Sequence, residues 1–194
     1  MPDLDGSTAL IVVDVQNDFA DPAGSLYVRG GEMTVSVAND LIERVLQVGG
    51  RVFYTQDWHP ERTPHFQIDG GVWPIHCVRD TWGAELQAAL RIAGPVVRKG
   101  SNGEDGYSGF TMRDPATGET MPTALDDLLQ SAAIERLVIL GLATDHCVKS
   151  TALDAASLGY QTTVVRAGIR AVDLVAGDGE RALDAMREAG VFID

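Results

Sequence analysis

The sequence predicts an α/β domain built on a mainly parallel central sheet flanked by helices. Short apolar runs alternate along the chain with longer segments of helical periodicity, which is typical of repeated strand–helix units. The apolar runs are nearly continuous, as expected for parallel strands that are covered on both faces. No repeat, low-complexity tract or linker divides the chain, so we expect a single domain over residues 1–194.

Each predicted strand or helix follows from a local feature of the sequence. Thr8–Val13 is predicted as a strand because it is apolar throughout, and Ser36–Val48 as a helix because its apolar residues recur at helical spacing until Gly49 and Gly50 end it. By the same criteria, further strands are expected at Arg51–Thr55, Pro95–Arg98, Leu137–Leu142, Thr162–Arg166 and Val191–Ile193. Further helices are expected at Thr81–Arg91, Ala124–Ala133, Cys147–Ser157 and Asp178–Ala189. The segments 19–31, 60–81 and 100–122 fit neither pattern, and long irregular segments in a domain of this size are usually functional.

The composition indicates an acidic globular chain. Of the 194 residues, 45% are hydrophobic, and 28 acidic against 15 basic residues give a formal net charge of −13. Such a surface repels phosphate backbones and anionic lipids, which argues against nucleic-acid and membrane-surface partners. No apolar run reaches the roughly 18 residues of a membrane helix, and the amino terminus lacks the basic region of a secretory signal. We therefore expect a cytoplasmic protein whose two cysteines are reduced.

Reactive side chains follow the ends of four predicted strands. Asp14 follows the first strand, Asp57 the second and Lys99 the third, and Cys147 begins the helix after the fourth. Because the carboxyl ends of parallel strands meet at one edge of a sheet, these side chains are expected to share a site. A helix amino terminus and Lys99 would favour the thiolate of Cys147, and Asp14 could remove and return its proton. Taken singly, each residue also has a structural interpretation, as a buried thiol, a surface charge or a helix cap.

A second cluster has the pattern Asp57-x-His59-x5-His65, followed by His76. Three imidazoles and a carboxylate suit a divalent transition metal, zinc first, with iron and manganese also compatible. The alternative is that these histidines are ordinary polar residues of a Pro-rich loop, since the spacing matches no common zinc-finger pattern. Cys77 follows His76 directly and is interpreted as a buried thiol rather than a fifth ligand.

Aromatic residues occupy the irregular segments. Phe19, Trp73 and Tyr107 have no strand or helix face to fill there, so they are expected to line a pocket for a flat substrate, although loop anchoring fits Tyr107 nearly as well. His146 precedes Cys147, but adjacent helical residues point about 100° apart. We therefore expect His146 to pack or hydrogen-bond behind the site and not to form a Cys–His dyad.

These motifs together resemble the isochorismatase-like cysteine hydrolases, and within them the nicotinamidases. They occur in the order of that family and cover the chain from near residue 8 to about residue 172. The matching stretches are ALIVVDVQNDF (9–19), TQDWHPERTPHF (55–66), WPIHCV (73–78), RKG (98–100), DGYSGF (105–110) and GLATDHCVKSTALDA (141–155).

The resemblance implies a doubly wound α/β fold and a role for each matching residue. The family's catalytic triad falls on Asp14, Lys99 and Cys147, and its metal site on Asp57, His59, His65 and His76. The peptide bond between Leu142 and Ala143 falls on one that is cis in the family, which turns the Ala143 amide inward to form an oxyanion hole with the Cys147 amide. Phe19 and Trp73 match the rings that sandwich the pyridine of the substrate.

The implied activity is a metal-dependent deamidation of nicotinamide, and of pyrazinamide-like aromatic amides, to the acid and ammonia. Cys147 attacks the amide carbon and forms a thioester, while the pyridine nitrogen lies at or near the metal. Asp14 passes the thiol proton to ammonia and then serves as base for the hydrolytic water. The implied partner is a small aromatic amide, and the implied cofactor is one divalent metal ion.

Three other interpretations remain open. A sister hydrolase acting on a carbamoyl or ureido group shares the triad but generally lacks the metal cluster. Isochorismatase proper lacks the cysteine, so Cys147 argues against it. A non-enzymatic metal-binding or regulatory protein can retain the fold, but a complete triad beside the metal set argues against that interpretation.

Overall fold

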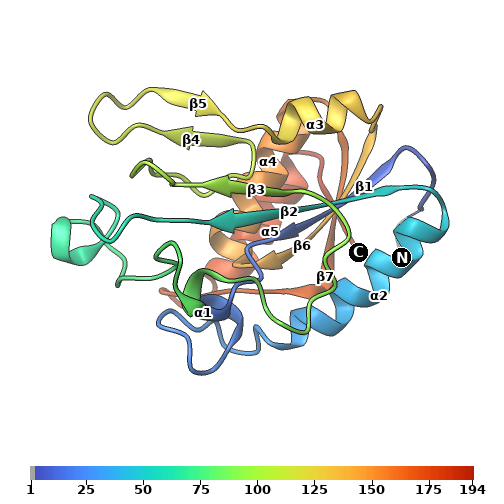
Figure 1. Ribbon diagram of the computed structural model, residues 1–194. Coiled ribbons are helices and arrows are strands. Elements are labelled where there is room, and N and C mark those ends of the chain that lie inside the picture. The colour runs from blue at the N-terminus through green and yellow to red at the C-terminus, as the bar shows by residue number, and fades with distance from the viewer. Residues whose placement is uncertain (1–2) are drawn as a thin grey trace.

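A six-stranded parallel sheet forms the centre of the computed structural model, which describes residues 3–194 (Figure 1). The strand order is β3-β2-β1-β6-β7-β8, and every neighbouring pair is parallel. The order runs outward from β1 in both directions, which confirms the predicted parallel sheet and the doubly wound fold that the family resemblance implied. The strands are β1 (Thr8–Val13), β2 (Arg51–Asp57), β3 (Val96–Lys99), β6 (Arg136–Leu142), β7 (Gln161–Arg170) and β8 (Phe192–Ile193).

Helices cover both faces of this sheet (Figure 1). Helix α2 packs on β1, β2, β6 and β7. Because right-handed crossovers in opposite directions place helices on opposite faces, α3, α4 and α5 lie on the other side. The helices are α1 (Asn17–Ala20), α2 (Met33–Gln47), α3 (Leu125–Ser131), α4 (Lys149–Ser157) and α5 (Asp178–Glu188).

The core is the sheet itself and the apolar faces of these helices. All six residues of β1 are buried, as are all residues of β6 after the first. Continuous burial explains why these strands read as unbroken apolar runs in the sequence. On α2, the apolar positions Leu41, Ile42 and Val45 are buried, which confirms the helical spacing predicted there.

One predicted helix is wrong. The segment Thr81–Arg91 forms only a short 3-10 turn, Trp82–Ala84, because its backbone groups bond to other segments. The carbonyl of Ala84 accepts hydrogen bonds from the side chains of Gln16 and Gln56, at 2.9 and 2.8 Å. The segment also forms an antiparallel bridge at Leu86 with residue 16. Tertiary hydrogen bonds thus override the local helical tendency.

Between β3 and α3 the structure adds a hairpin that the sequence did not predict. Its strands are β4 (Thr111–Arg113) and β5 (Thr120–Pro122), and they form a separate two-stranded sheet beyond the β3 edge (Figure 1). Strands of three residues are too short for period-2 alternation to be visible. The hairpin lies in the segment 100–122, which was expected to be irregular.

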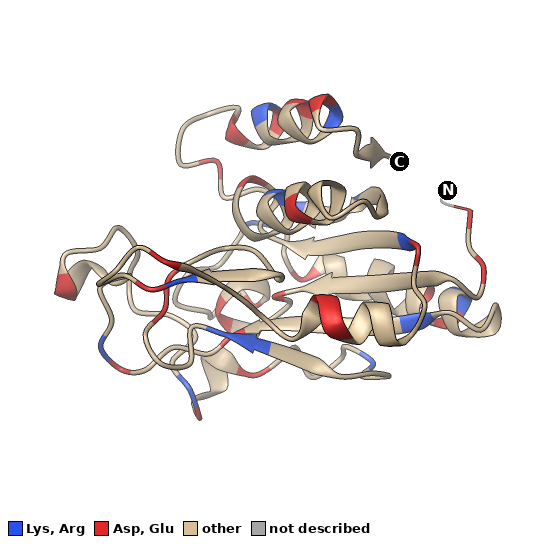
Figure 2. Cartoon of the chain, turned by 90° about the horizontal axis from the view of Figure 1, so that it is seen from above, with Lys and Arg blue, Asp and Glu red and all other residues tan. Residues whose placement is uncertain are grey.

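The acidic excess is distributed around the sheet. Figure 2 shows Asp and Glu positions spread over helices and loops, while the strands are largely without them. Among residues 3–194, no helix has the length and apolar character needed to cross a membrane. The predicted cytoplasmic location stays a prediction.

A substitution at Gly141 tests whether strands β1 and β6 require their close backbone approach. The φ of Gly141 is +126°, and a Cβ built there would lie 2.0 Å from the backbone oxygen of Val13 on β1. We expect Gly141→Ala to lower the free energy of unfolding by about 3 kcal/mol or more, since the strands must separate and the backbone is strained. The matched control is Gly49→Ala, where φ is +80° but the space is open, with an expected cost of about 1 kcal/mol. Equal losses in chemical denaturation would contradict the steric account.

Candidate active site

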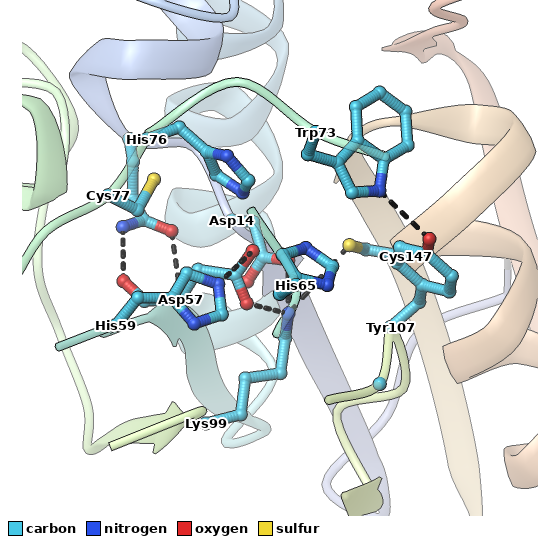
Figure 3. Close-up of polar contacts among 12 residues, drawn as sticks. Asp14, Asp57, His59, His65, Trp73, His76, Cys77, Lys99, Tyr107 and Cys147 are labelled. Atoms are coloured by element: carbon cyan, nitrogen blue, oxygen red, sulfur yellow. Dashed lines mark hydrogen bonds and ion pairs between the residues drawn. The ribbon is translucent and has the colours of Figure 1, made fainter. Parts of the chain in front are cut away.

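The residues predicted at the strand ends lie together at the carboxyl edge of the sheet (Figure 3). Asp57 and Lys99 are the last residues of β2 and β3, and Asp14 directly follows β1. Cys147 lies in a π-helical turn, Thr144–Val148, between β6 and α4. The structure therefore brings an acid, a lysine and a thiol to one place, as the parallel topology requires.

Lys99 is the centre of this group. Its buried Nζ lies 2.9 Å from Oδ2 of Asp14 and 3.7 Å from Sγ of Cys147. It also donates a hydrogen bond to Oδ1 of Asp57 (Figure 3). Burial alone would lower the pKa of Lys99, but the carboxylates of Asp14 and Asp57 outweigh it and hold the pKa well above its usual range. Lys99 is therefore a buried ammonium group between two carboxylates.

Asp14 is held by its neighbour on β2. The hydroxyl of Thr55 donates to Oδ1 of Asp14 over 2.6 Å, and the backbone N–H of Asp14 donates to the Thr55 carbonyl over 3.3 Å. Among the described residues, no donor points at Oδ2 with hydrogen-bond geometry, although the Lys99 ammonium lies close. Burial raises the pKa of Asp14, and Lys99 opposes that shift in part. Oδ2, held by the ion pair with Lys99, can accept a proton, and burial makes this carboxylate more basic than one in water.

Cys147 is a buried thiol beside this carboxylate. The two side chains place a ligand atom each within 4.8 Å of one another. Burial raises the pKa of the Cys147 thiol well above its usual range, and the Lys99 ammonium offsets only part of this shift. The expected thiolate is therefore opposed by burial, and Cys147 is a thiol at rest, because desolvation of the charged form outweighs the effect of the Lys99 ammonium. Such a thiol needs a base when it attacks.

The backbone before Cys147 has an unusual path. The peptide bond between Leu142 and Ala143 is cis, as the family resemblance implied. The Ala143 carbonyl accepts hydrogen bonds from the N–H groups of His146 and Val148, both at 3.1 Å, which flank that of Cys147 in the sequence. Ala143 and Cys147 both line the cavity described below.

Three histidines form a second cluster next to Asp57. His59, His65 and His76 are buried, and one ring nitrogen from each lies within 4.8 Å of the others. Oδ2 of Asp57 lies 3.8 Å from Nε2 of His59. Among residues 3–194, neither ring nitrogen of His59 has a hydrogen-bond partner. Buried, unpartnered imidazole nitrogens beside a carboxylate fit a divalent metal ion, because an ion is the partner that such a donor set lacks.

The protonation of these groups also suits a metal. Burial lowers the pKa of His59 to about 4 and lowers that of His76 as well, so both rings are neutral near neutral pH. Burial alone would raise the pKa of Asp57, but Lys99 and the two histidines outweigh it and lower the pKa to about 2. Metal ligands must be deprotonated to bind, and these three are.

A small cavity, partly open to solvent, lies at this edge. Its mainly apolar lining with a few polar side chains is typical of a small-molecule site. It is lined by Phe19, Leu26, Val28, Asp57, His65, Trp73, His76, Tyr107, Ala143, His146, Cys147 and Val172. The structure thus places the three predicted aromatic residues in one cavity with the nucleophile candidate. Trp73 Nε1 donates to the Tyr107 hydroxyl over 2.9 Å, which ties two of these walls together.

His146 and Cys77, whose roles the sequence left open, occupy different positions. His146 packs on Trp73 and Tyr107, with ring centroids 4.9 and 5.2 Å apart. It was expected to pack behind the site, but it forms part of the cavity wall through its contacts with these two rings. Cys77 is a fully buried thiol outside the histidine cluster, in agreement with its predicted structural role.

Sequence reasoning missed two residues that hold the others in place. Gln16 exchanges two hydrogen bonds with the backbone of Asp57, at 2.7 and 2.8 Å. Asp105 lies 2.6 Å from Nδ1 of His65, and this hydrogen bond lowers the pKa of Asp105. Both belong to motifs that the sequence displays, VDVQNDF and DGYSGF. The presence of a polar residue within each of these motifs was the sequence feature that could have identified Gln16 and Asp105.

Comparisons with known proteins agree with this geometry. The isochorismatase domain family matches residues 8–193 of the chain. The nicotinamidase of Escherichia coli (strain K12) is 39% identical, over 95% of this chain and 93% of that protein. The crystal structure of the pyrazinamidase of Pyrococcus horikoshii in complex with zinc has a TM-score of 0.85 at 35% identity, covering 97% and 98% of the two chains. That of PnC1 from L. infantum in complex with nicotinate has a TM-score of 0.90 at 34% identity, covering 100% and 95%.

The depressed pKa of His59 predicts acid sensitivity of the metal-free protein. The imidazole has a pKa of about 4 in the folded chain against 6.5 in its ordinary state. Between these values the unfolded chain binds the proton more readily, so stability is fully present above pH 6.5 and is lost as the pH falls toward 4. We expect a loss of about 3 kcal/mol from this group in urea denaturation of the metal-free protein. His59→Gln should remove that part of the pH dependence, and an unchanged slope in this variant would contradict the assignment.

Proposed function

Because the chain belongs to the isochorismatase domain family, we propose that it is an amidohydrolase that deamidates nicotinamide to nicotinate and ammonia, and that it also accepts pyrazinamide-like aromatic amides. The observation that carries this proposal is the single cavity that Cys147 shares with two histidines of the cluster and three aromatic side chains. A thiol with an adjacent carboxylate base performs acyl transfer, and a mainly apolar cavity lined by aromatic rings suits a flat, neutral ring.

Substrate binding depends on the cavity walls. Phe19 and Trp73 present ring surfaces on which an aromatic substrate can stack, and the hydrogen bond between Trp73 and Tyr107 holds one wall in place. Nicotinamide is uncharged, so the acidic surface of the protein neither attracts nor repels it.

The first chemical step is attack of Cys147 on the amide carbon. Asp14 takes the thiol proton through Oδ2 as the new S–C bond forms, because the buried thiol does not ionise by itself. The backbone N–H groups of Ala143 and Cys147 stabilise the negative charge that develops on the amide oxygen. Asp14 then gives its proton to the leaving nitrogen, the C–N bond breaks, and ammonia departs from a thioester. Lys99 stabilises the charged forms of both Asp14 and Cys147 throughout.

The second step is hydrolysis of the thioester. Asp14 again acts as the base, now for a water molecule that attacks the same carbon. The C–S bond breaks, Cys147 recovers its proton, and the carboxylic acid product is released. One amide and one water are consumed, and one acid and one ammonia are formed.

Asp57, His59, His65 and His76 would hold one divalent metal ion, for which we propose zinc. When bound, the ion supplies a Lewis acid that can hold an electron-pair donor such as a ring nitrogen. The P. horikoshii structure in complex with zinc supports this choice. Iron and manganese remain compatible with the same nitrogen and oxygen ligands.

The activity is tested by measuring ammonia release from nicotinamide with metal supplied. We expect turnover by the unaltered protein and a loss of about 10⁴-fold or more in kcat for Cys147→Ala, because the nucleophile is removed. Cys77→Ala is the matched control: it removes the other buried cysteine and is expected to retain turnover, with circular dichroism confirming that both variants fold.

A panel of ureido and carbamoyl compounds, assayed beside nicotinamide, decides between this proposal and a sister hydrolase. Turnover of the panel without turnover of nicotinamide would overturn the nicotinamidase proposal. Full activity of Cys147→Ala on nicotinamide would overturn the mechanism instead.

The metal site is tested by metal analysis after dialysis. We expect bound zinc to fall in each of His59→Ala, His65→Ala and His76→Ala, because each variant removes one ligand. His146→Ala is the matched control, since this fourth histidine lines the cavity but lies outside the cluster. Unchanged metal content in all three ligand variants would exclude the proposed site.

A further inference from the structure

His65 differs from the other two clustered histidines in what holds its ring. Its Nδ1 lies 2.6 Å from a carboxylate oxygen of Asp105, whereas Nδ1 of His76 faces the carbonyl of Pro74 at 2.7 Å. Both ring nitrogens of His59 are without a hydrogen-bond partner in residues 3–194. An ionised carboxylate can only accept a hydrogen bond, so Nδ1 of His65 carries the proton and Nε2 carries the lone pair.

Asp105 reaches the cluster from a different part of the chain. It lies between β3 and β4, and its backbone exchanges two hydrogen bonds with Arg113 on β4, at 2.8 and 2.6 Å. The N–H of Gly106 donates to the same carboxylate oxygen that faces His65, over 2.8 Å. The β4–β5 hairpin therefore fixes the carboxylate, and the carboxylate fixes the imidazole.

The exposure of the two side chains indicates what this contact is for. The side chain of His65 is 6% exposed, whereas that of Asp105 is 36% exposed. A carboxylate at that position fills no core volume, so its removal leaves no large cavity. Its contribution is the hydrogen bond to the imidazole, in the arrangement that orients metal-bound histidines in many proteins.

We infer that Asp105 is a positioning residue of the metal site, which commits His65 to binding the ion through Nε2 and makes that nitrogen a stronger donor. The inference rests on the metal site of the proposed function. It also assigns a purpose to the β4–β5 hairpin, which carries no ligand itself but anchors the residue that orients one.

The test measures zinc affinity directly, by competition between the metal-free protein and a chelating indicator. We expect Asp105→Ala to weaken binding by about 10- to 100-fold, because the imidazole is free to rotate and to change tautomer. Asp105→Asn keeps a neutral acceptor of the same shape and should restore part of that loss. The matched control is Glu119→Gln, which removes the same charge from an exposed position in the same hairpin and is expected to bind zinc normally.

A spectroscopic measurement separates positioning from a general effect on folding. With cobalt(II) in place of zinc, the visible absorption bands report the ligand geometry. We expect them to shift in Asp105→Ala and to return toward the unaltered spectrum in Asp105→Asn. Thermal denaturation of the metal-free variants confirms that each is folded.

The inference is overturned if Asp105→Ala and Asp105→Asn both bind zinc within about twofold of the unaltered protein, or if Glu119→Gln weakens binding as much as they do. Absence of zinc binding by the unaltered protein would overturn the proposed metal site as well. The two failures are therefore distinguishable.

Discussion

The buried ammonium of Lys99, held between the carboxylates of Asp14 and Asp57, is the interaction on which the site depends. Taking an ion out of water costs several kcal/mol unless close opposite charges compensate for it. Here the compensation comes from three adjacent parallel strands. Asp57 and Lys99 are register partners on β2 and β3, and Asp14 extends β1 by one residue beyond its last pairing with β2. A slip of one residue in either pairing would bury an unpaired charge.

Two carboxylates against one ammonium leave an excess of negative charge in a buried place. Two features of the site limit this excess, one beside Asp57 and one beside Asp14. The neutral imidazole of His59 lies beside the far oxygen of Asp57, which suits a cation there, and the thiol of Cys147 stays protonated beside Asp14. The same charge pattern thus accounts for a metal site and for a nucleophile that needs a base. Asp57 belongs to both, since one of its oxygens faces Lys99 and the other faces His59.

Most of the fold and of the site was predictable from the sequence, because both depend on strand ends. Buried parallel strands are visible as apolar runs, and a reactive residue directly after each run is placed by the topology alone. What the sequence did not reveal depends on contacts between distant segments. The Thr81–Arg91 segment is not helical because side chains such as Gln16 donate hydrogen bonds to its carbonyl groups. The contribution of Asp105 depends on its hydrogen bond to the imidazole of His65, 40 positions away in the chain. The position of His146 was wrongly predicted because its ring packs on Trp73 and Tyr107, which lie far from it in the chain.

The proposed mechanism requires that Cys147 becomes acylated during turnover, and mass spectrometry of acid-quenched reactions can detect this acyl group. Saturating nicotinamide should produce a peptide in which Cys147 carries the nicotinoyl group, while the peptide containing Cys77 stays unmodified. The adduct should vanish once the substrate is exhausted. Steady turnover with no acyl group on Cys147 at any quench time, or with the acyl group on Cys77, would contradict the assignment of Cys147 as the nucleophile.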